Sequence, residues 1–164
     1  MLERLQQVAF LVRDLEEGKE LYRRHLGMEI CHSEDLSNYG LLNAVLSAGN
    51  GTFIELLQPT SADSSAARYL ERRGEAPYML IFETSEYDRL IRHLKSLGVR
   101  LSEEPSTGDY RHAFIHPSST NGAFLEVIEV TASNNPWPPA GPDWQSLEHK
   151  PLTKQVRQTA VLVR

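Results

Sequence analysis

The chain has 164 residues, of which 40% are hydrophobic and 24% are charged, and its formal net charge at pH 7 is -5. This length and composition predict one globular domain with a hydrophobic core, or two small modules that share one, and argue against a chain that is disordered throughout. Because the net charge is negative and the sequence has no dense run of Lys or Arg, we expect no nucleic-acid partner. The lack of a signal peptide or a long apolar run, with a single cysteine that cannot form an internal disulfide, indicates a cytoplasmic protein without a membrane partner.

The first half of the chain predicts one helix and four strands in the order βαβββ. Its predicted strands, each rich in apolar residues, span residues 5–13, 28–32, 41–48 and 52–58. Asp14 with Glu17 three residues later has the capping-box pattern that begins a helix, and Gly27 ends it. A variable polar stretch over residues 33–39 precedes the last two strands, which the turn at residues 49–51 joins as a hairpin.

The second half repeats that order after a connecting segment. The connection contains a short predicted helix over residues 64–73, which Gly74 ends. A second helix is expected between a Ser85 cap and Gly98. The predicted strands of this half span residues 78–84, 99–101, 110–115 and 123–130.

The two halves also match residue by residue. Residues 53–57 (FIELL) and residues 124–128 (FLEVI) have the same separation along the chain as the helix-ending Gly27 and Gly98. The sequence therefore predicts two copies of one supersecondary unit, over residues 5–58 and 77–130.

Each copy places a carboxylate on an apolar strand face. Side chains alternate faces along a strand, so Glu126 shares its face with Phe124 and Ile128, and Glu55 holds the equivalent place in the first copy. An ionised carboxylate there is unfavourable unless it is paired, or unless the face meets water at a rim. If the copies pack about a pseudo-twofold axis, the two carboxylates converge on one cavity. They then serve either as metal ligands or as a general acid/base pair.

These features resemble a known family. The matching segments are residues 53–59, 67–75, 94–101 and 114–122, followed by the Glu126 strand. They resemble the vicinal oxygen chelate superfamily, the glyoxalase, bleomycin-resistance and extradiol dioxygenase group, and most closely its methylmalonyl-CoA epimerase family. The resemblance implies an α+β fold in which two paired βαβββ modules form an open, cup-shaped mixed β-sheet with helices outside. The resemblance covers about residues 5–130, and it implies a domain over residues 1–130 with residues 131–164 as a C-terminal extension.

The resemblance also implies a metal site, which this sequence modifies. In the family, four strand residues hold a divalent metal, and their positions here are Gln7, Glu55, Met79 and Glu126. The first and third are usually histidines, so Gln7 and Met79 each replace an expected histidine. Met79 is interpreted as an apolar residue that fills the cup. A divalent metal such as Co, Zn, Ni, Mn or Mg on Gln7, Glu55 and Glu126, and a cup without metal, both remain open.

His112 offers a further partner for Glu126. If Ile115 faces Ala123 in the last hairpin, His112 lies directly across from Glu126. A shift of one residue in the register would send His112 to the other face. The pair would either add an imidazole ligand for a metal or act as a metal-free acid/base couple.

The extension over residues 131–164 is rich in proline and contains both tryptophans. Its composition predicts an extended arm, because proline continues neither a helix nor a central strand. Trp137 and Trp144 are expected to pack on the body or on another subunit, and we expect a homodimer. A disordered linker is the alternative.

Two functions are consistent with these patterns. The first is an epimerase- or isomerase-like enzyme that moves a proton next to the carbonyl of a small acyl substrate, such as a CoA thioester. Its catalytic residues would be Glu126 and Glu55, with His112 as partner. The alternative is a metal-free protein of the same fold that binds a small hydrophobic ligand, as resistance proteins do, or a glyoxalase-like lyase.

Overall fold

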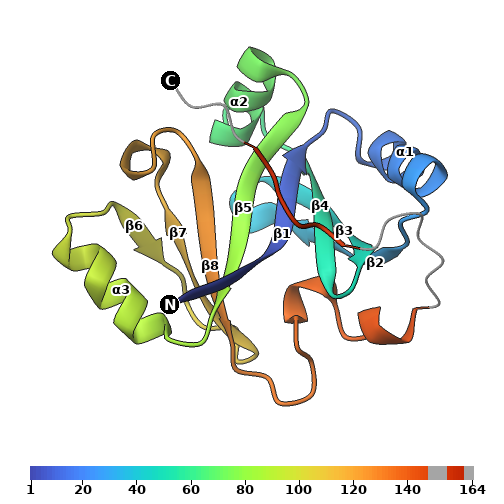
Figure 1. The fold of residues 1–164 in the computed structure, drawn as a ribbon. Coiled ribbons are helices and arrows are strands. Elements are labelled where there is room, and N and C mark those ends of the chain that lie inside the picture. The colour runs from blue at the N-terminus through green and yellow to red at the C-terminus, as the bar shows by residue number, and fades with distance from the viewer. Residues whose placement is uncertain (148–154, 161–164) are drawn as a thin grey trace.

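The computed structural model describes residues 1–147 and 155–160, and one mixed β-sheet dominates it (Figure 1). Within these residues the sheet has eight strands in the order β2-β3-β4-β1-β5-β8-β7-β6. The strands are β1 (Leu2–Leu11), β2 (Ile30–Leu36), β3 (Leu41–Gly49), β4 (Thr52–Pro59), β5 (Ala76–Thr84), β6 (Leu101–Glu103), β7 (Tyr110–Ile115) and β8 (Phe124–Val130). The helices are α1 (Leu15–Leu26), α2 (Ser65–Arg73) and α3 (Tyr87–Ser96).

The pairing of the central strands is symmetric. Strand β1 pairs in parallel with β4, β5 pairs in parallel with β8, and β1 and β5 run antiparallel to each other at the centre. In the central pair Gln7 faces Ile81 and Ala9 faces Met79. Because a twofold rotation exchanges these two pairs, the predicted arrangement of two βαβββ modules in one open sheet is confirmed.

Helices α1 and α3 cover the outer face of the sheet, whereas α2 packs with residues of the inner face. Leu15 begins α1 and packs with Val8 and Leu56, while Leu90 and Ile91 of α3 pack with Val127. Figure 1 shows α1 and α3 at opposite ends of the sheet. The inner face is therefore left to form the walls of a cup.

The predicted ends of α1 and α2 are confirmed. The Asp14 side chain accepts a hydrogen bond of 2.9 Å from the backbone N–H of Glu17, and Gly27 ends α1 in the left-handed conformation with φ 65°. Ser64 caps α2, and Gly74 follows its last turn.

Three local predictions were wrong. The polar stretch over residues 33–39 continues β2 to Leu36, because it pairs with β3 as an edge strand, and only residues 37–39 form a short 3-10 turn. Ser85 does not cap α3, since its hydroxyl bonds to the Glu3 carboxylate and the helix begins two residues later at Tyr87. Strand β6 lies two residues beyond the predicted residues 99–101, where it pairs with β7.

The segment after β8 folds back onto the sheet. It forms 3-10 turns at Pro138–Ala140 and Trp144–Ser146, and the first of these packs on β2 and β3. The Trp137 side chain is completely buried in the core cluster of the inner face. The part of the prediction that concerns residues 148–154 and 161–164 lies outside the described residues. In the described part of the chain, no helix combines the length and the apolar character needed to cross a membrane.

Candidate active site

A cavity of about 660 Å³ opens on the inner face of the sheet, and both modules line it. Its walls are largely apolar or aromatic and include Leu41, Leu57, Tyr78, Ile81, Phe114, Phe124 and Ile128. Among the acidic residues that line it, two have buried carboxyl groups, Glu55 on β4 and Glu126 on β8. The structure therefore brings together the two carboxylates that the repeat singled out.

Glu55 is held by two amide groups. Its Oε2 accepts a hydrogen bond of 3.0 Å from Nε2 of Gln7, and its Oε1 accepts one of 3.0 Å from Nδ2 of Asn43. Asn43 lies on β3, where Val45 is the direct partner of Glu55 and Asn43 is its diagonal neighbour on the same face. Both carboxylate oxygens thus have a donor although the group is buried.

The two amides are oriented by groups that can only donate. The Trp137 indole N–H donates to Oε1 of Gln7 over 2.9 Å, and the backbone N–H of Glu34 donates to Oδ1 of Asn43 over 2.9 Å. Because neither the indole nor a backbone N–H accepts a hydrogen bond, each amide turns its oxygen outward and its NH2 group toward Glu55.

Burial nevertheless dominates the ionisation of Glu55. It raises the pKa of this carboxyl from 4.5 to about 7, and the nearby Glu126 adds to the rise, while the hydrogen bonds from Asn43 and Gln7 oppose it. Glu55 therefore changes its charge near neutral pH.

Glu126 is paired with a histidine. Nδ1 of His112 lies 2.7 Å from Oε1 of Glu126, and both side chains are buried. Burial raises the pKa of Glu126, and the His112 hydrogen bond opposes this. Beside them Tyr110 packs edge-on against the His112 ring, and burial together with Glu126 raises the pKa of its phenol to about 12.

The structure brings His112 to Glu126 through a register that differs from the predicted one. Ile115 pairs with Leu125 rather than Ala123, so the direct partner of His112 is Ile128. The difference of two residues leaves His112 on the same face, because side chains alternate with a period of two. His112 therefore reaches Glu126 as a diagonal neighbour.

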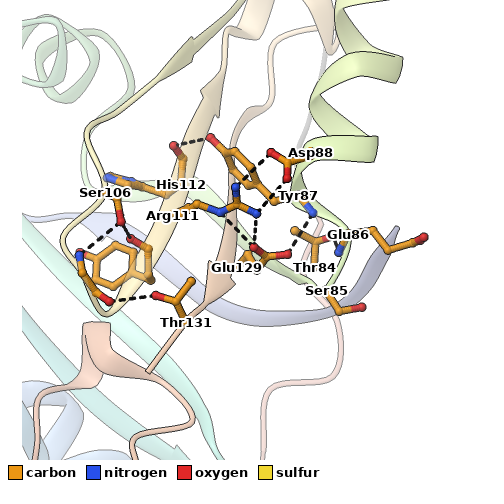
Figure 2. A network of polar contacts seen from close by, with 12 residues as sticks. Thr84, Ser85, Glu86, Tyr87, Asp88, Ser106, Arg111, His112, Glu129 and Thr131 are labelled. Carbon is orange, nitrogen blue, oxygen red and sulfur yellow. Dashed lines mark hydrogen bonds and ion pairs between the residues drawn. The ribbon is translucent and has the colours of Figure 1, made fainter. Parts of the chain in front are cut away.

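The outer side of this hairpin is held by a charged network (Figure 2). Nη1 of Arg111 donates to Asp88 over 3.0 Å, Nε of Arg111 donates to Glu129 over 3.0 Å, and the guanidinium carbon lies 4.8 Å from the centre of the Tyr87 ring. The Tyr87 hydroxyl donates to the backbone carbonyl of His112 over 2.8 Å. Helix α3 thus holds β7 at the residue whose side chain enters the cavity.

The side chains at the four family metal positions do not fit a divalent metal. Gln7 turns its NH2 group to Glu55 and its oxygen to Trp137, and an amide NH2 group cannot ligate a cation. Met79 supplies a thioether, which suits soft ions such as Cu(I) rather than the hard ions that carboxylates prefer. Within residues 1–147 and 155–160 no three His, Cys, Asp or Glu side chains are arranged to hold a metal.

Asn43 and Trp137 are residues of this site that the sequence did not single out. Asn43 lies on a predicted strand, but only its diagonal relation to Glu55 in the β3–β4 hairpin reveals its role. Trp137 was expected to pack, and nothing in the sequence connects its indole to Gln7. The only signal in the sequence was that Trp137 lies between two prolines, which indicated a segment that packs in a fixed conformation.

Comparison with known proteins places the chain in a family. Residues 4–127 match the family model described as the Glyoxalase/Bleomycin resistance protein/Dioxygenase superfamily. Because the match spans most of the chain and the observed fold agrees with it, the chain belongs to this superfamily.

Its relatives within the superfamily include epimerases. The chain is 32% identical over 135 residues to an ethylmalonyl-CoA/methylmalonyl-CoA epimerase from Cereibacter sphaeroides. This alignment covers 79% of this chain and 100% of the relative. The structure of methylmalonyl-CoA epimerase from Mycobacterium tuberculosis matches with a TM-score of 0.73 and 32% identity, over 80% of this chain and 90% of that one. A methylmalonyl-CoA epimerase in complex with methylmalonyl-CoA and NH4+ matches with a TM-score of 0.73 and 27% identity, over 83% of this chain and 100% of that one.

Proposed function

We propose that the protein is an epimerase- or isomerase-like enzyme that moves a proton at the carbon next to the carbonyl of an acyl thioester. The observation that carries the proposal is the buried Glu55 carboxyl, whose pKa is about 7. A group with such a pKa is present in both its acid and its base form at neutral pH, which is the condition for efficient proton transfer. The similarity to methylmalonyl-CoA epimerases supports a CoA thioester as the substrate class.

Two acid/base groups from opposite halves of the cup suit this reaction. In one direction the Glu55 carboxylate takes the proton from the substrate carbon, and the C–H electron pair moves to the carbonyl oxygen to give an enolate. Glu126 in its acid form then returns a proton to the same carbon from the other side, and the enolate electrons close the new C–H bond. In the reverse direction Glu126 is the base and Glu55 is the acid. The raised pKa of both carboxyl groups lets each of them act in either role.

Hydrogen-bond donors on the cavity wall would hold the enolate oxygen. Asn43 and Gln7 turn their NH2 groups toward Glu55, and each NH2 group has a second hydrogen beside the one that bonds to Glu55. The high pKa of Tyr110 keeps its phenol protonated. Such preorganised donors stabilise developing negative charge in a water-poor site. The proposed mechanism uses no metal, because Gln7 and Met79 do not supply suitable ligands for a divalent metal at the family's metal positions.

The direct test is incorporation of deuterium. Methylmalonyl-CoA and propionyl-CoA are incubated with the protein in deuterated water, and exchange at the carbon next to the carbonyl is followed by NMR. Glu55→Gln and Glu126→Gln should each slow the exchange by about 100-fold or more, because a positioned acid/base contributes that much. Glu71→Gln on the exposed side of α2 is the matched control and should leave the rate unchanged.

The alternative is a cup that only binds a small hydrophobic ligand, which the largely apolar walls favour. Binding of either thioester without any exchange above the rate in buffer would support this alternative and contradict the enzyme. Elemental analysis provides a second test. Stoichiometric divalent metal that is lost in Glu126→Gln would contradict the metal-free mechanism.

A further inference from the structure

The two modules match in the sheet but differ in what covers their inner faces. Phe53 of β4 and Phe124 of β8 hold equivalent places in the repeat. Phe53 is completely buried, and Trp144 of the arm packs edge-on against it with ring centres 5.1 Å apart. Phe124 is only half-buried and lines the cavity. The arm thus covers the ring of the first module, while the equivalent ring of the second module faces the cavity.

Phe124 belongs to a continuous set of aromatic rings. The centre of its ring lies 5.4 Å from that of Tyr78 on β5 and 5.6 Å from that of Phe114 on β7. The Phe114 ring lies 6.2 Å from that of Tyr39, which is in the 3-10 turn after β2. All four residues line the cavity, and each keeps part of its surface exposed. We call these four residues the aromatic wall.

The aromatic wall lies beside one of the two acid/base groups. Phe114 is the direct partner of Glu126 across the β7–β8 pair, and Phe124 lies two residues before Glu126 on the same face. Residues that face each other across two strands have Cβ atoms about 4.5–5.5 Å apart. A ligand group that packs on these two rings is therefore attached to the carbon that exchanges its proton, or close to it.

The shape of the wall favours an aromatic ring over an aliphatic group of the same size. The planes of neighbouring rings are inclined by 69°, 34° and 78° along the series, so the wall offers both faces and edges of rings. Another aromatic ring meets such a surface in edge-to-face or offset contacts, which contribute more than the buried area alone. The cavity of about 660 Å³ has the size of sites for drug-sized ligands, and a methyl or ethyl group would leave most of the wall uncovered.

We propose that the aromatic wall binds the acyl group of the substrate and selects one with an aromatic ring on the carbon next to the carbonyl, such as an arylacetyl or 2-arylpropionyl thioester. This inference rests on the proposed function and names its substrate class. Phe114 and Phe124 then determine specificity. Trp144 excludes the ring from the equivalent place beside Phe53.

The test is isothermal titration calorimetry with phenylacetyl-CoA, cyclohexylacetyl-CoA and propionyl-CoA. Phenylacetyl-CoA should bind about 3-fold to 10-fold more tightly than cyclohexylacetyl-CoA, and more than about 10-fold more tightly than propionyl-CoA. Phe124→Leu keeps an apolar side chain but removes the ring, so the preference for phenyl over cyclohexyl should disappear. Phe10→Leu is the matched control and should keep the preference, because Phe10 packs against Tyr22 on the outer face.

Equal affinity for the phenyl and cyclohexyl compounds, or loss of the preference in Phe10→Leu as well, would overturn the proposal. NMR on the unaltered protein covers the case in which Phe124→Leu does not fold. The phenyl protons of bound phenylacetyl-CoA should show nuclear Overhauser effects to the rings of Phe114 and Phe124 and none to Phe53. Effects to aliphatic side chains such as Leu57 alone would also overturn it.

Turnover is measured separately, as deuterium exchange at the carbon next to the carbonyl of each thioester. A preference for the phenyl compound without exchange would support the aromatic wall and contradict the enzyme. Exchange together with equal affinity for all three thioesters would support the enzyme and overturn the aromatic specificity. Absence of binding by all three would overturn both.

Discussion

The buried Glu55 carboxyl should make the protein less stable as the pH rises. In the folded protein its pKa is about 7, whereas its ordinary value is 4.5. Between these two values the unfolded chain releases the proton and the folded chain keeps it. Folding is then linked to proton uptake, so the free energy of unfolding falls with increasing pH across this interval.

The magnitude follows from the two pKa values. Each pKa unit corresponds to about 1.4 kcal/mol, so the interval from 4.5 to about 7 is equivalent to a loss of about 3 kcal/mol. This stability is fully present below pH 4.5 and is lost by the time the pH has passed through about 7. A loss of this size is a substantial share of the stability of a single domain.

Glu55→Gln removes the titration without removing the volume of the side chain. The free energy of unfolding of the variant should be lowered by a contribution that does not depend on pH, because one end of the glutamine amide is an NH2 group and cannot accept a hydrogen bond from Gln7 or Asn43. The loss of stability with rising pH should disappear. The quantity that tests the prediction is therefore the slope of the free energy of unfolding with pH, and not its value at a single pH.

Urea denaturation followed by circular dichroism between pH 4 and pH 9 measures this slope in both proteins. The free energies of unfolding of wild type and Glu55→Gln should differ by an amount that changes by about 3 kcal/mol over that range. Glu126 and His112 are present in both proteins, so their own contributions largely cancel in the difference. Two parallel curves would refute the raised pKa of Glu55 and would remove the observation that carries the proposed function.

Two further predictions concern residues that hold the site in place. Gly141→Ala should destabilise the protein by about 1–3 kcal/mol from its backbone conformation and by more from the collision of the new Cβ with His32, 3.0 Å away. Gly74→Ala, with nearly the same φ and ψ and open space around its Cβ, is the control; equal losses in urea denaturation would exclude the His32 contact. Tyr87→Phe keeps the ring beside Arg111 but removes one of the two donors to the His112 carbonyl, leaving the backbone N–H of Glu104, so it should cost about 1 kcal/mol by the same measurement. Unchanged stability of Tyr87→Phe would mean that this hydrogen bond does not hold β7.

Much of the fold could be predicted because the βαβββ pattern occurs twice in the sequence. The match between residues 53–57 and 124–128 indicated two modules, and the same match made Glu55 and Glu126 the candidate pair. Periodicity was sufficient here, because a strand that buries one face must show it at every second residue. It was insufficient for residues 33–39, where an edge strand has few buried positions and its polar composition resembles a loop.

The surroundings of Glu55 could be predicted only in part. Gln7 was identified through its position in the family pattern, but whether it offered an oxygen or an NH2 group depended on Trp137. That contact joins the first strand to the arm at the other end of the sequence, and no local pattern encodes it. His112 was found despite a wrong register, since an error of two residues preserves the face of a strand.

The position of the arm in the chain has a consequence for how the molecule is completed during synthesis. Strand β1 is made first but lies in the middle of the sheet, between β4 and β5, and so finds its last neighbour only when about half the chain exists. The cup can close once β8 has been made, whereas Trp137 leaves the ribosome later still. A shortened chain that ends near Val130 would therefore retain the residues of the repeated sheet, with Gln7 free to turn either way beside Glu55.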